Sequence, residues 1–233
     1  MHKLIKKKIL CTICARKGSK GLRNKNFLKL LNKPLILYSI QQAKNSKAFS
    51  KIVVSSDSKK ILNFSKKKID LTINRPNKYS NDRSSKIEAI RHALIVSEKR
   101  FNTNFDIIVD LDITSPLRSS TYIKKAINLF MSKNCTNLVS GSIAKKNPFF
   151  NQVMFKKKKL SLVCKSKRKI VRRQSAPKVY DLNASIYIWN RKSLIKSTKL
   201  NNKNSIFFEM PQSRSIDIDD KFDFLMVKLI LKN

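Results

Sequence analysis

The sequence predicts an α/β protein with a mostly parallel sheet and helices on both faces. Short apolar, β-branched runs alternate with segments of helical periodicity, and their spacing suits successive βαβ units. The chain has 233 residues, of which 41% are hydrophobic, so it can bury one full-sized core. We therefore expect a single domain over residues 1–233.

The expected elements begin with a buried strand at residues 9–15, followed by a polar, Gly-containing loop to Asn26. Pro34 is suited to the start of a helix that runs to about Asn45. Ser56-Asp57-Ser58 supplies caps for a helix through residue 64. Further strands are expected at 51–55, 69–73, 105–111 and 137–143, and further helices at 84–99 and 120–131.

The alternation stops after Ala144. Two strand-like runs, 151–155 and 160–164, are separated by a lysine tract with no helix between them. They predict a β-hairpin inserted in the α/β frame, within about residues 145–180. Strands are expected again at 184–189, 206–210 and 216–218, followed by a helix at 222–231.

The charge is strongly basic: 52 Lys+Arg against 14 Asp+Glu give a net charge of +38. A basic nucleic-acid-binding protein is therefore one hypothesis, because basic surfaces bind phosphates through counterion release. The lysines are, however, spread along the whole chain, and Lys, Asn and Ile are abundant while Gly, Ala and Pro are scarce. This is typical of an AT-rich coding sequence, so we favour solvated lysines and expect no nucleic-acid partner.

Membrane and thiol chemistry are also not expected. No apolar run approaches the ~20 residues of a membrane span, and the N-terminal apolar stretch is too short for a signal peptide. We therefore expect no membrane association and a cytoplasmic location. Cys11 and Cys14 form a C-x-x-C within a predicted strand, where their sulfurs face opposite ways, so buried reduced thiols are expected. His92 is expected at the edge of the core rather than as a catalytic base.

The loop after the first strand is a predicted phosphate-binding site. The chain contains only three glycines, and Gly18 and Gly21 both lie here among basic residues. Glycine permits close approach to a ligand, and successive exposed N–H groups bind anions. The loop matches neither the Walker A pattern nor the dinucleotide-binding G-x-G-x-x-G pattern.

Acidic residues concentrate near the other end of the chain, in Asp217-Ile-Asp-Asp-Lys-Phe-Asp223. Ser215-Ile-Asp-Ile-Asp219 alternates at period two, so Asp217 and Asp219 are expected to share one strand face and to form a partial ligand set for Mg²⁺. The alternative is that Asp219 or Asp220 caps the following helix, and both roles are compatible if Asp220 is the cap. Asp110 and Asp112 have the same spacing at the end of another strand and are a weaker metal candidate.

Four motifs in this order resemble the acylneuraminate cytidylyltransferases. They are Ala15-Arg-Lys-Gly-Ser-Lys-Gly-Leu-Arg-Asn-Lys-Asn26, Thr114-Ser-Pro-Leu-Arg118, Asn183-Ala-Ser-Ile-Tyr-Ile188 and Ser215-Ile-Asp-Ile-Asp219. These enzymes are the CMP-sialic acid synthetases and relatives acting on other nine-carbon 2-keto sugar acids. The resemblance runs from about residue 9 to 230. It implies a Rossmann-like nucleotide-diphospho-sugar transferase fold, the substrate CTP and the cofactor Mg²⁺. It also implies a homodimer in which residues 145–180 reach over the partner's active site.

The resemblance also assigns roles by motif position. Nucleotide binding is implied for Arg16, Gly18, Ser19, Lys20, Gly21, Lys25, Asn26, Arg75, Asp82, Ser84 and Ser85. Contact with the sugar acid is implied for Asp112, Thr114, Ser115, Arg173, Asp181 and Asn183. Asp217 and Asp219 would bind Mg²⁺, and Arg16, Lys20 and Asp219 would be catalytic.

Two departures from the sialic-acid enzymes lie near the expected sugar site. This chain has Asp112-Ile-Thr-Ser-Pro-Leu-Arg118 in place of Gln-Pro-Thr-Ser-Pro-Leu-Arg. It has Asp181-Leu-Asn-Ala-Ser-Ile-Tyr187 in place of Arg-Pro-Asn-Gly-Ala-Ile-Tyr. Both resemble the branch that activates legionaminic-type sugars. An alternative within the same fold is 3-deoxy-manno-octulosonate cytidylyltransferase, whose motifs match less well.

The reaction implied is in-line attack by the anomeric C2 hydroxyl of the sugar on the α-phosphorus of CTP, with release of pyrophosphate. Phosphoryl-type transfer depends mainly on positioning and on neutralisation of developing charge. Lys20 and Arg16 would stabilise that charge, and no general base is assigned.

Overall fold

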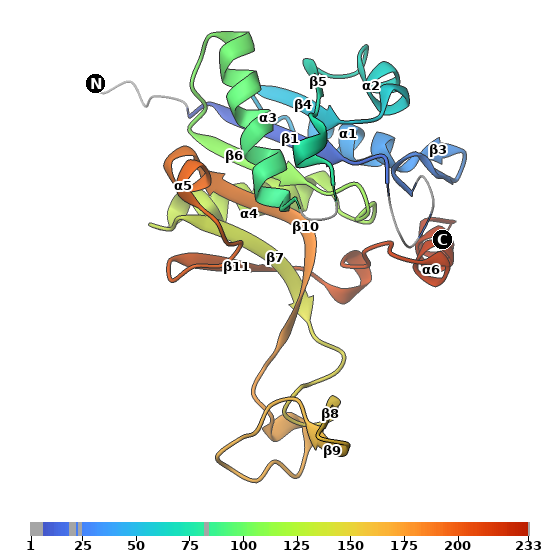
Figure 1. Ribbon diagram of the computed structural model, residues 1–233, viewed down its shortest axis with the longest axis vertical. Helices are drawn as coiled ribbons and strands as arrows, with labels where there is room; N and C mark the ends of the chain where they lie inside the picture. Colours follow the sequence, from blue (N-terminus) through green and yellow to red (C-terminus); the bar gives the residue numbers. More distant parts are fainter. Residues whose placement is uncertain (1–6, 19–21, 23–24, 82–83, 233) are drawn as a thin grey trace.

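The chain folds around one seven-stranded sheet with the order β11-β7-β10-β6-β1-β4-β5 (Figure 1). The computed structural model describes residues 7–18, 22, 25–81 and 84–232. The strands of the sheet are β1 (Ile9–Ala15), β4 (Lys51–Ser56), β5 (Leu71–Asn74), β6 (Ile107–Leu111), β7 (Asn137–Ile143), β10 (Tyr180–Asn190) and β11 (Ser205–Glu209). The neighbouring pairs run parallel except for those of β10, which is antiparallel to both β6 and β7. The predicted, mostly parallel sheet is confirmed.

Helices cover both faces of the sheet. They are α1 (Leu35–Ser46), α2 (Lys59–Ser65), α3 (Lys86–Phe101), α4 (Ser120–Ser132), α5 (Arg191–Lys196) and α6 (Lys221–Lys232). One core cluster joins the sheet to α1, α2, α4 and α6, and the other joins it to α3 and α5. The two clusters take alternate residues of β1, as the pleat of a strand requires: Cys11 lies in the first and Leu10 in the second.

The strand predicted at residues 216–218 is wrong. The structure places a short 3-10 helix, η4 (Gln212–Arg214), before an irregular segment that runs to α6. Ile218 is buried, and its N–H donates to the Thr114 carbonyl at 2.9 Å. The alternation of Ile and Asp therefore reflects packing of one side of an extended segment on the core, without a strand partner. Asp220 does cap α6, because its side chain accepts from the Asp223 N–H at 2.9 Å.

The predicted hairpin is present as β8 (Val153–Lys156) and β9 (Lys159–Leu162), an antiparallel pair. Figure 1 shows it projecting from the body at the end of two long arms that continue β7 and β10. Its two-residue turn is Lys157-Lys158, with φ of 47° and 65°, as in the hairpin turns that match strand twist. The smaller pair β2 (Lys29–Leu30) and β3 (Lys33–Pro34) was not predicted.

The strand order places a topological switch point at β1 and β6. From β1 the chain moves outward through β4 to β5, and then returns to the other side of β1 to form β6. Because β1 and β6 are adjacent and parallel, the loops that follow them leave the same edge of the sheet side by side. In open α/β sheets, ligands bind in the crevice that forms at such a switch point, outside the carboxyl ends of the strands. Within the described part of the chain, no helix has the length and apolar character needed to cross a bilayer.

Candidate active site

A cavity of about 550 Å³ lies at the switch point. It is lined by Cys14, Arg16, Lys25, Asn26, Arg75, Tyr79, Ser80, Asn81, Ser84, Ser85, Lys86, Ala89, Asp112, Thr114, Asp217 and Asp219. These residues come from the end of β1 and the loop after it, the segment between β5 and α3, the start of α3, the loop after β6 and the segment before α6. The cavity therefore joins parts of the chain that are far apart in sequence.

The basic loop near the start of the chain meets the acidic segment near its end. Lys25 Nζ lies 2.9 Å from Asp219 Oδ1, across 194 positions of sequence. Lys25 is largely buried, with a side chain 13% exposed, whereas that of Asp219 is 78% exposed. Asp217 and Asp219 both line the cavity, although the strand that was expected to align them is absent.

The loops around the cavity are braced by hydrogen bonds of their own. Asn26 Nδ2 donates to the Arg16 carbonyl at 2.9 Å, and the Lys17 N–H donates to Asp57 Oδ1 at 2.7 Å. Ser85 is the N-cap of α3 and forms a reciprocal capping box with Glu88. The Ser84 hydroxyl donates to the Lys78 carbonyl at 2.6 Å. Ser84 and Ser85 therefore stabilise the loop before α3 as well as lining the cavity.

Arg75 brings a buried positive charge to the cavity wall. Its side chain is 6% exposed, and Nε and Nη2 have no hydrogen-bond partner among the described residues. Burying a guanidinium without partners is unfavourable, so an anion or another acceptor in the cavity would satisfy it. His92 packs nearby on Tyr79, with ring centroids 5.0 Å apart. Partial burial, then Arg75 and Lys78, lower the pKa of His92, as suits a neutral edge-of-core histidine.

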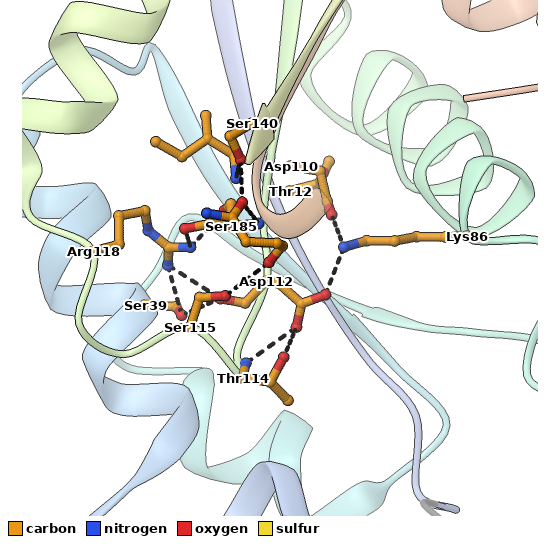
Figure 2. Close-up of polar contacts among 12 residues, drawn as sticks. Thr12, Ser39, Lys86, Asp110, Asp112, Thr114, Ser115, Arg118, Ser140 and Ser185 are labelled. Atoms are coloured by element: carbon orange, nitrogen blue, oxygen red, sulfur yellow. Dashed lines mark hydrogen bonds and ion pairs between the residues drawn. The ribbon is translucent and has the colours of Figure 1, made fainter. Parts of the chain in front are cut away.

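Three charged side chains meet at the end of β6 (Figure 2). Lys86 Nζ lies 2.6 Å from Asp112 Oδ2 and 3.1 Å from Asp110 Oδ2. Asp112 Oδ1 in turn accepts from the Thr114 N–H at 3.1 Å and from its hydroxyl at 2.9 Å. Burial opposes ionisation of Asp112, but Lys86 and then Thr114 hold its pKa well below the ordinary value. The Asp110–Asp112 pair is therefore already neutralised in part by Lys86.

Arg118 fastens the loop after β6 to β10. It is 2% exposed, and its Nη2 donates to the Ser39 hydroxyl at 3.0 Å and to the Asp112 carbonyl at 3.1 Å. Its Nη1 donates to the Ser185 carbonyl at 2.5 Å, as Figure 2 shows. Burial, the first cause, lowers the pKa of Arg118 to about 10, although nearby acidic groups oppose that change. This guanidinium fixes the shape of the cavity floor rather than facing a ligand.

A smaller cavity of about 190 Å³ adjoins the first. It is lined by Ser142, Ile143, Lys145, Asp181, Leu182, Asn183, Gln212, Ser215, Ile216 and Asp217. Asn183 is 4% exposed, and its amide is engaged with Ser140 and Ser215. It sits in an irregular stretch of β10 between Leu182 and Tyr187, where Ala184 has a positive φ of 50°.

Asp217 lines both cavities and so marks the place where they meet. Its Oδ1 is buried and has no hydrogen-bond partner among the described residues. Burial raises the pKa of Asp217 to about 6, with Asp112 and Asp219 adding to the rise. A buried, unsatisfied carboxylate oxygen with a second carboxylate nearby suits a hard cation such as Mg²⁺. Asp217 and Asp219 therefore fit the metal that the sequence motif implied.

The residues expected at the site fall into three groups. The first cavity gathers Arg16, Lys25, Asn26, Arg75, Ser84, Ser85, Asp112, Thr114, Asp217 and Asp219, and the second gathers Asp181 and Asn183. Gly18, Ser115 and Arg173 line neither cavity: Ser115 is buried behind the wall, and Arg173 lies in the projecting region, where it binds the Lys145 carbonyl. Ser19, Lys20, Gly21 and Asp82 lie outside the described residues.

Lys86, Arg118 and Tyr79 were not assigned roles from the sequence. Lys86 is the first residue of α3, directly after the capping Ser85, but nothing distinguishes it among 52 basic residues. Arg118 belongs to the motif Thr114-Ser-Pro-Leu-Arg118, but the sequence does not show that its side chain is buried. Cys11 and Cys14 are free thiols on opposite sides of β1 as expected; Cys11 is fully buried, whereas Cys14 borders the cavity.

Comparison with known proteins finds relatives that match nearly the whole chain. The family model described as Cytidylyltransferase matches residues 10–214. CMP-N,N'-diacetyllegionaminic acid synthase of Campylobacter jejuni is 44% identical over 225 residues, covering 96% of this chain and 94% of that protein. Post-translational flagellin modification protein B of Campylobacter coli is 42% identical, covering 96% and 95%. N-acylneuraminate cytidylyltransferase of Escherichia coli is 32% identical, covering 93% of this chain and 50% of that protein.

Solved structures share the fold. A CMP:2-keto-3-deoxy-manno-octonic acid synthetase complexed with CTP superposes with a TM-score of 0.69, covering 97% of this chain and 98% of that one. A 4-diphosphocytidyl-2C-methyl-D-erythritol synthase also gives 0.69, covering 97% and 99%. Their identities are 15% and 11%, so they speak for the Rossmann-like nucleotidyltransferase fold alone. The octonic-acid synthetase is thus far less similar in sequence than the legionaminic acid synthase.

Proposed function

The chain belongs to the cytidylyltransferase family, and we propose that it activates a legionaminic-type, nine-carbon 2-keto sugar acid with CTP. The products are the CMP-sugar and pyrophosphate. The observation that carries the proposal is the pair of adjoining cavities that share Asp217. The larger has the volume and cationic lining for a nucleoside triphosphate, and the smaller adjoins it where a second substrate would attack.

In this proposal the nucleotide occupies the larger cavity. Arg16, Lys25 and Arg75 neutralise the triphosphate, and Asn26 holds the loop that carries Arg16. Lys20 and Ser19 are assigned to the same triphosphate on the motif alone. The sugar acid occupies the smaller cavity, where Lys145 offers a cation for its carboxylate and Asp181 an acceptor for its hydroxyl or acetamido N–H groups.

The reaction is in-line transfer at the junction of the two cavities. The anomeric C2 hydroxyl of the sugar loses its proton to solvent and its oxygen forms a bond to the α-phosphorus, while the bond from that phosphorus to the bridging oxygen of pyrophosphate breaks. Asp217 and Asp219 would hold Mg²⁺, which supplies Lewis-acid stabilisation of phosphate charge when bound. The residues of this chain bring the two substrates into line and hold the cationic groups in place before the reaction begins.

The projecting region is proposed to mediate a homodimer. Val153, Phe155 and Leu160 are exposed by 53%, 76% and 62%, which is unusual for apolar residues on neighbouring strands. A second copy of the chain covering this hairpin would bury them and would bring Arg173 to the partner's sugar site. We place the reaction in the cytoplasm, where nucleoside triphosphates are available.

Two measurements test these proposals. Pyrophosphate release is assayed with CTP, Mg²⁺ and a panel of legionaminic, sialic, pseudaminic and 3-deoxy-manno-octulosonic acids, and a legionaminic acid is expected to be the preferred substrate. Asp219→Ala is expected to abolish turnover, while Asp220→Asn, on the same segment but engaged with Asp223, retains it. Preference for the octulosonic acid, or normal turnover by Asp219→Ala, contradicts the proposal.

The dimer is tested by light scattering after size-exclusion chromatography. Phe155→Glu should shift the protein to monomer. The control Ile95→Glu, at an exposed apolar position on α3 outside the hairpin, should leave the mass unchanged. A wild-type monomer at micromolar concentration contradicts the dimer without touching the assignment of the reaction.

A further inference from the structure

Asp110 and Asp112 present two carboxylate oxygens to one point in space, and Lys86 Nζ occupies that point. In each carboxylate one oxygen is already held: Asp110 Oδ1 by the Thr12 hydroxyl at 2.8 Å, and Asp112 Oδ1 by Thr114. The second oxygens both turn toward Lys86, at 3.1 Å and 2.6 Å (Figure 2). Two oxygens converging in this way, at the edge of a nucleotide-sized cavity, resemble half of a divalent-cation site.

The burial of these groups favours a cation between the two carboxylates. The Asp110 side chain is fully buried, and its Oδ2 has no hydrogen-bond partner in the described ranges of the chain, so the ammonium of Lys86 is its electrostatic counterpart. The Lys86 side chain is 26% exposed, and Lys86 lines the larger cavity. Burial by itself would lower the pKa of Lys86, but Asp112 and Asp110 raise it well above its ordinary value. Lys86 thus carries a permanent positive charge at this point.

The same contact supports the acidic segment of the site. Lys86 holds Asp112, Asp112 holds Thr114, and the Thr114 carbonyl accepts from the Ile218 N–H at 2.9 Å. Ile218 lies between Asp217 and Asp219. If a divalent ion filled the space between Asp110 and Asp112, these contacts would form only when the ion is bound. The ammonium of Lys86 is covalently attached to the chain, so the contacts persist without metal.

We propose that Lys86 is a built-in cation that occupies the Asp110–Asp112 pair, excludes divalent metal from it and confines metal binding to Asp217 and Asp219. Lys86 is therefore a positioning residue, which holds Asp112 and, through it, the acidic segment. Its ammonium takes the place that a second metal ion would otherwise occupy. The proposal deepens the proposed function, on which the metal role of Asp217 and Asp219 rests.

Mn²⁺ binding to the nucleotide-free protein tests it, by electron paramagnetic resonance or calorimetry. Lys86→Ala is expected to bind one more Mn²⁺ per chain than the wild type, because the vacated carboxylate pair gains oxygen ligands for the metal. Lys86→Arg, which keeps the charge, and Lys124→Ala, which removes an exposed lysine on α4, should show the wild-type number. A folded Lys86→Ala with no additional Mn²⁺ overturns the proposal.

Two further measurements keep the test valid if Lys86→Ala is unstable. Mn²⁺ should raise the melting temperature of Lys86→Ala more than that of the wild type, since the ion replaces the missing charge. Asp110→Asn should leave Mn²⁺ stoichiometry unchanged, because the wild-type pair holds no metal, and loss of a bound ion there overturns the proposal. If the wild type binds no Mn²⁺ at all, the metal role of Asp217 and Asp219 fails, while the difference between Lys86→Ala and wild type still decides this inference.

Discussion

The side-chain amide of Asn183 donates to the Ser215 hydroxyl at 3.1 Å, and so joins strand β10 to the segment that carries Asp217 and Asp219. The amide oxygen of Asn183 accepts from the Ser140 hydroxyl at 2.7 Å and from the Ser185 N–H at 3.1 Å. The motif predicts that Asn183 contacts the sugar. Asn183 does line the smaller cavity, but its side-chain amide already forms hydrogen bonds within the protein. Its main effect is therefore to hold the floor where the two cavities meet.

Asn183→Ala is predicted to lower both stability and turnover. Several buried polar groups would lose their partners, which costs about 2–3 kcal/mol of unfolding free energy in total. Turnover should fall more than the apparent affinity for CTP, because the acidic segment loses its tie to β10. Urea unfolding and steady-state kinetics measure the two effects. Asn45→Ala, at an exposed position on α1, is the control, and equal stability of the two variants would contradict the prediction.

Ala184→Gly is predicted to stabilise the protein. Ala184 has a φ of 50°, in the left-handed region where a Cβ costs about 1–2 kcal/mol. Removing that methyl group should therefore raise the unfolding free energy by about 1 kcal/mol, after the greater freedom of glycine in the unfolded chain is counted. Thermal or urea unfolding checks this. A decrease in stability would show that the methyl contributes more through packing than the backbone loses through strain.

Arg75→Met is predicted to weaken nucleotide binding without destabilising the fold. Two buried nitrogens of the guanidinium have no hydrogen-bond partner within the described part of the chain, so its removal relieves a desolvation cost in the protein without nucleotide. A charged hydrogen bond to a ligand contributes about 1.5–3 kcal/mol, which corresponds to a loss of roughly 10- to 100-fold in CTP affinity. Calorimetric titration with CTP measures the affinity, and a melting curve measures the stability of the fold. Lower stability combined with unchanged affinity would assign Arg75 a structural role instead.

Asp217 is predicted to make the metal-free protein less stable as pH rises from about 4 to about 7. Its folded pKa of about 6 lies above the unfolded value, so the folded state binds the proton more tightly. The corresponding stability is present at low pH and is lost as the pH rises through that folded pKa. Asp217→Asn should remove this dependence, gaining on the order of 2 kcal/mol relative to wild type near pH 7. Urea unfolding at several pH values, in the presence of a chelator, measures the difference, and parallel curves for both proteins would contradict it.

The layer structure could be predicted because it rests on local patterns. β-Branched runs and helical periodicity repeat at intervals that suit βαβ units, and strand β7 was predicted with the bounds that the structure has. The inserted hairpin was predictable for the same reason, since two short strands follow each other without a helix. The strand at residues 216–218 was wrong because alternation shows only that one side is buried, whereas a strand also needs a neighbour that provides hydrogen bonds.

The candidate site was predictable only as a list of residues. The sequence by itself determined the fold class and two charged stretches, one basic and one acidic, because composition and spacing are properties of the chain alone. Only the tertiary structure decided that Lys25 meets Asp219, that Arg75 is buried with two nitrogens lacking a partner among the described residues, and that Lys86 stands between Asp110 and Asp112. The physical reason is that the energy of a charge depends on its burial and its neighbours, and both are set when distant loops leave adjacent strands at the same edge of the sheet.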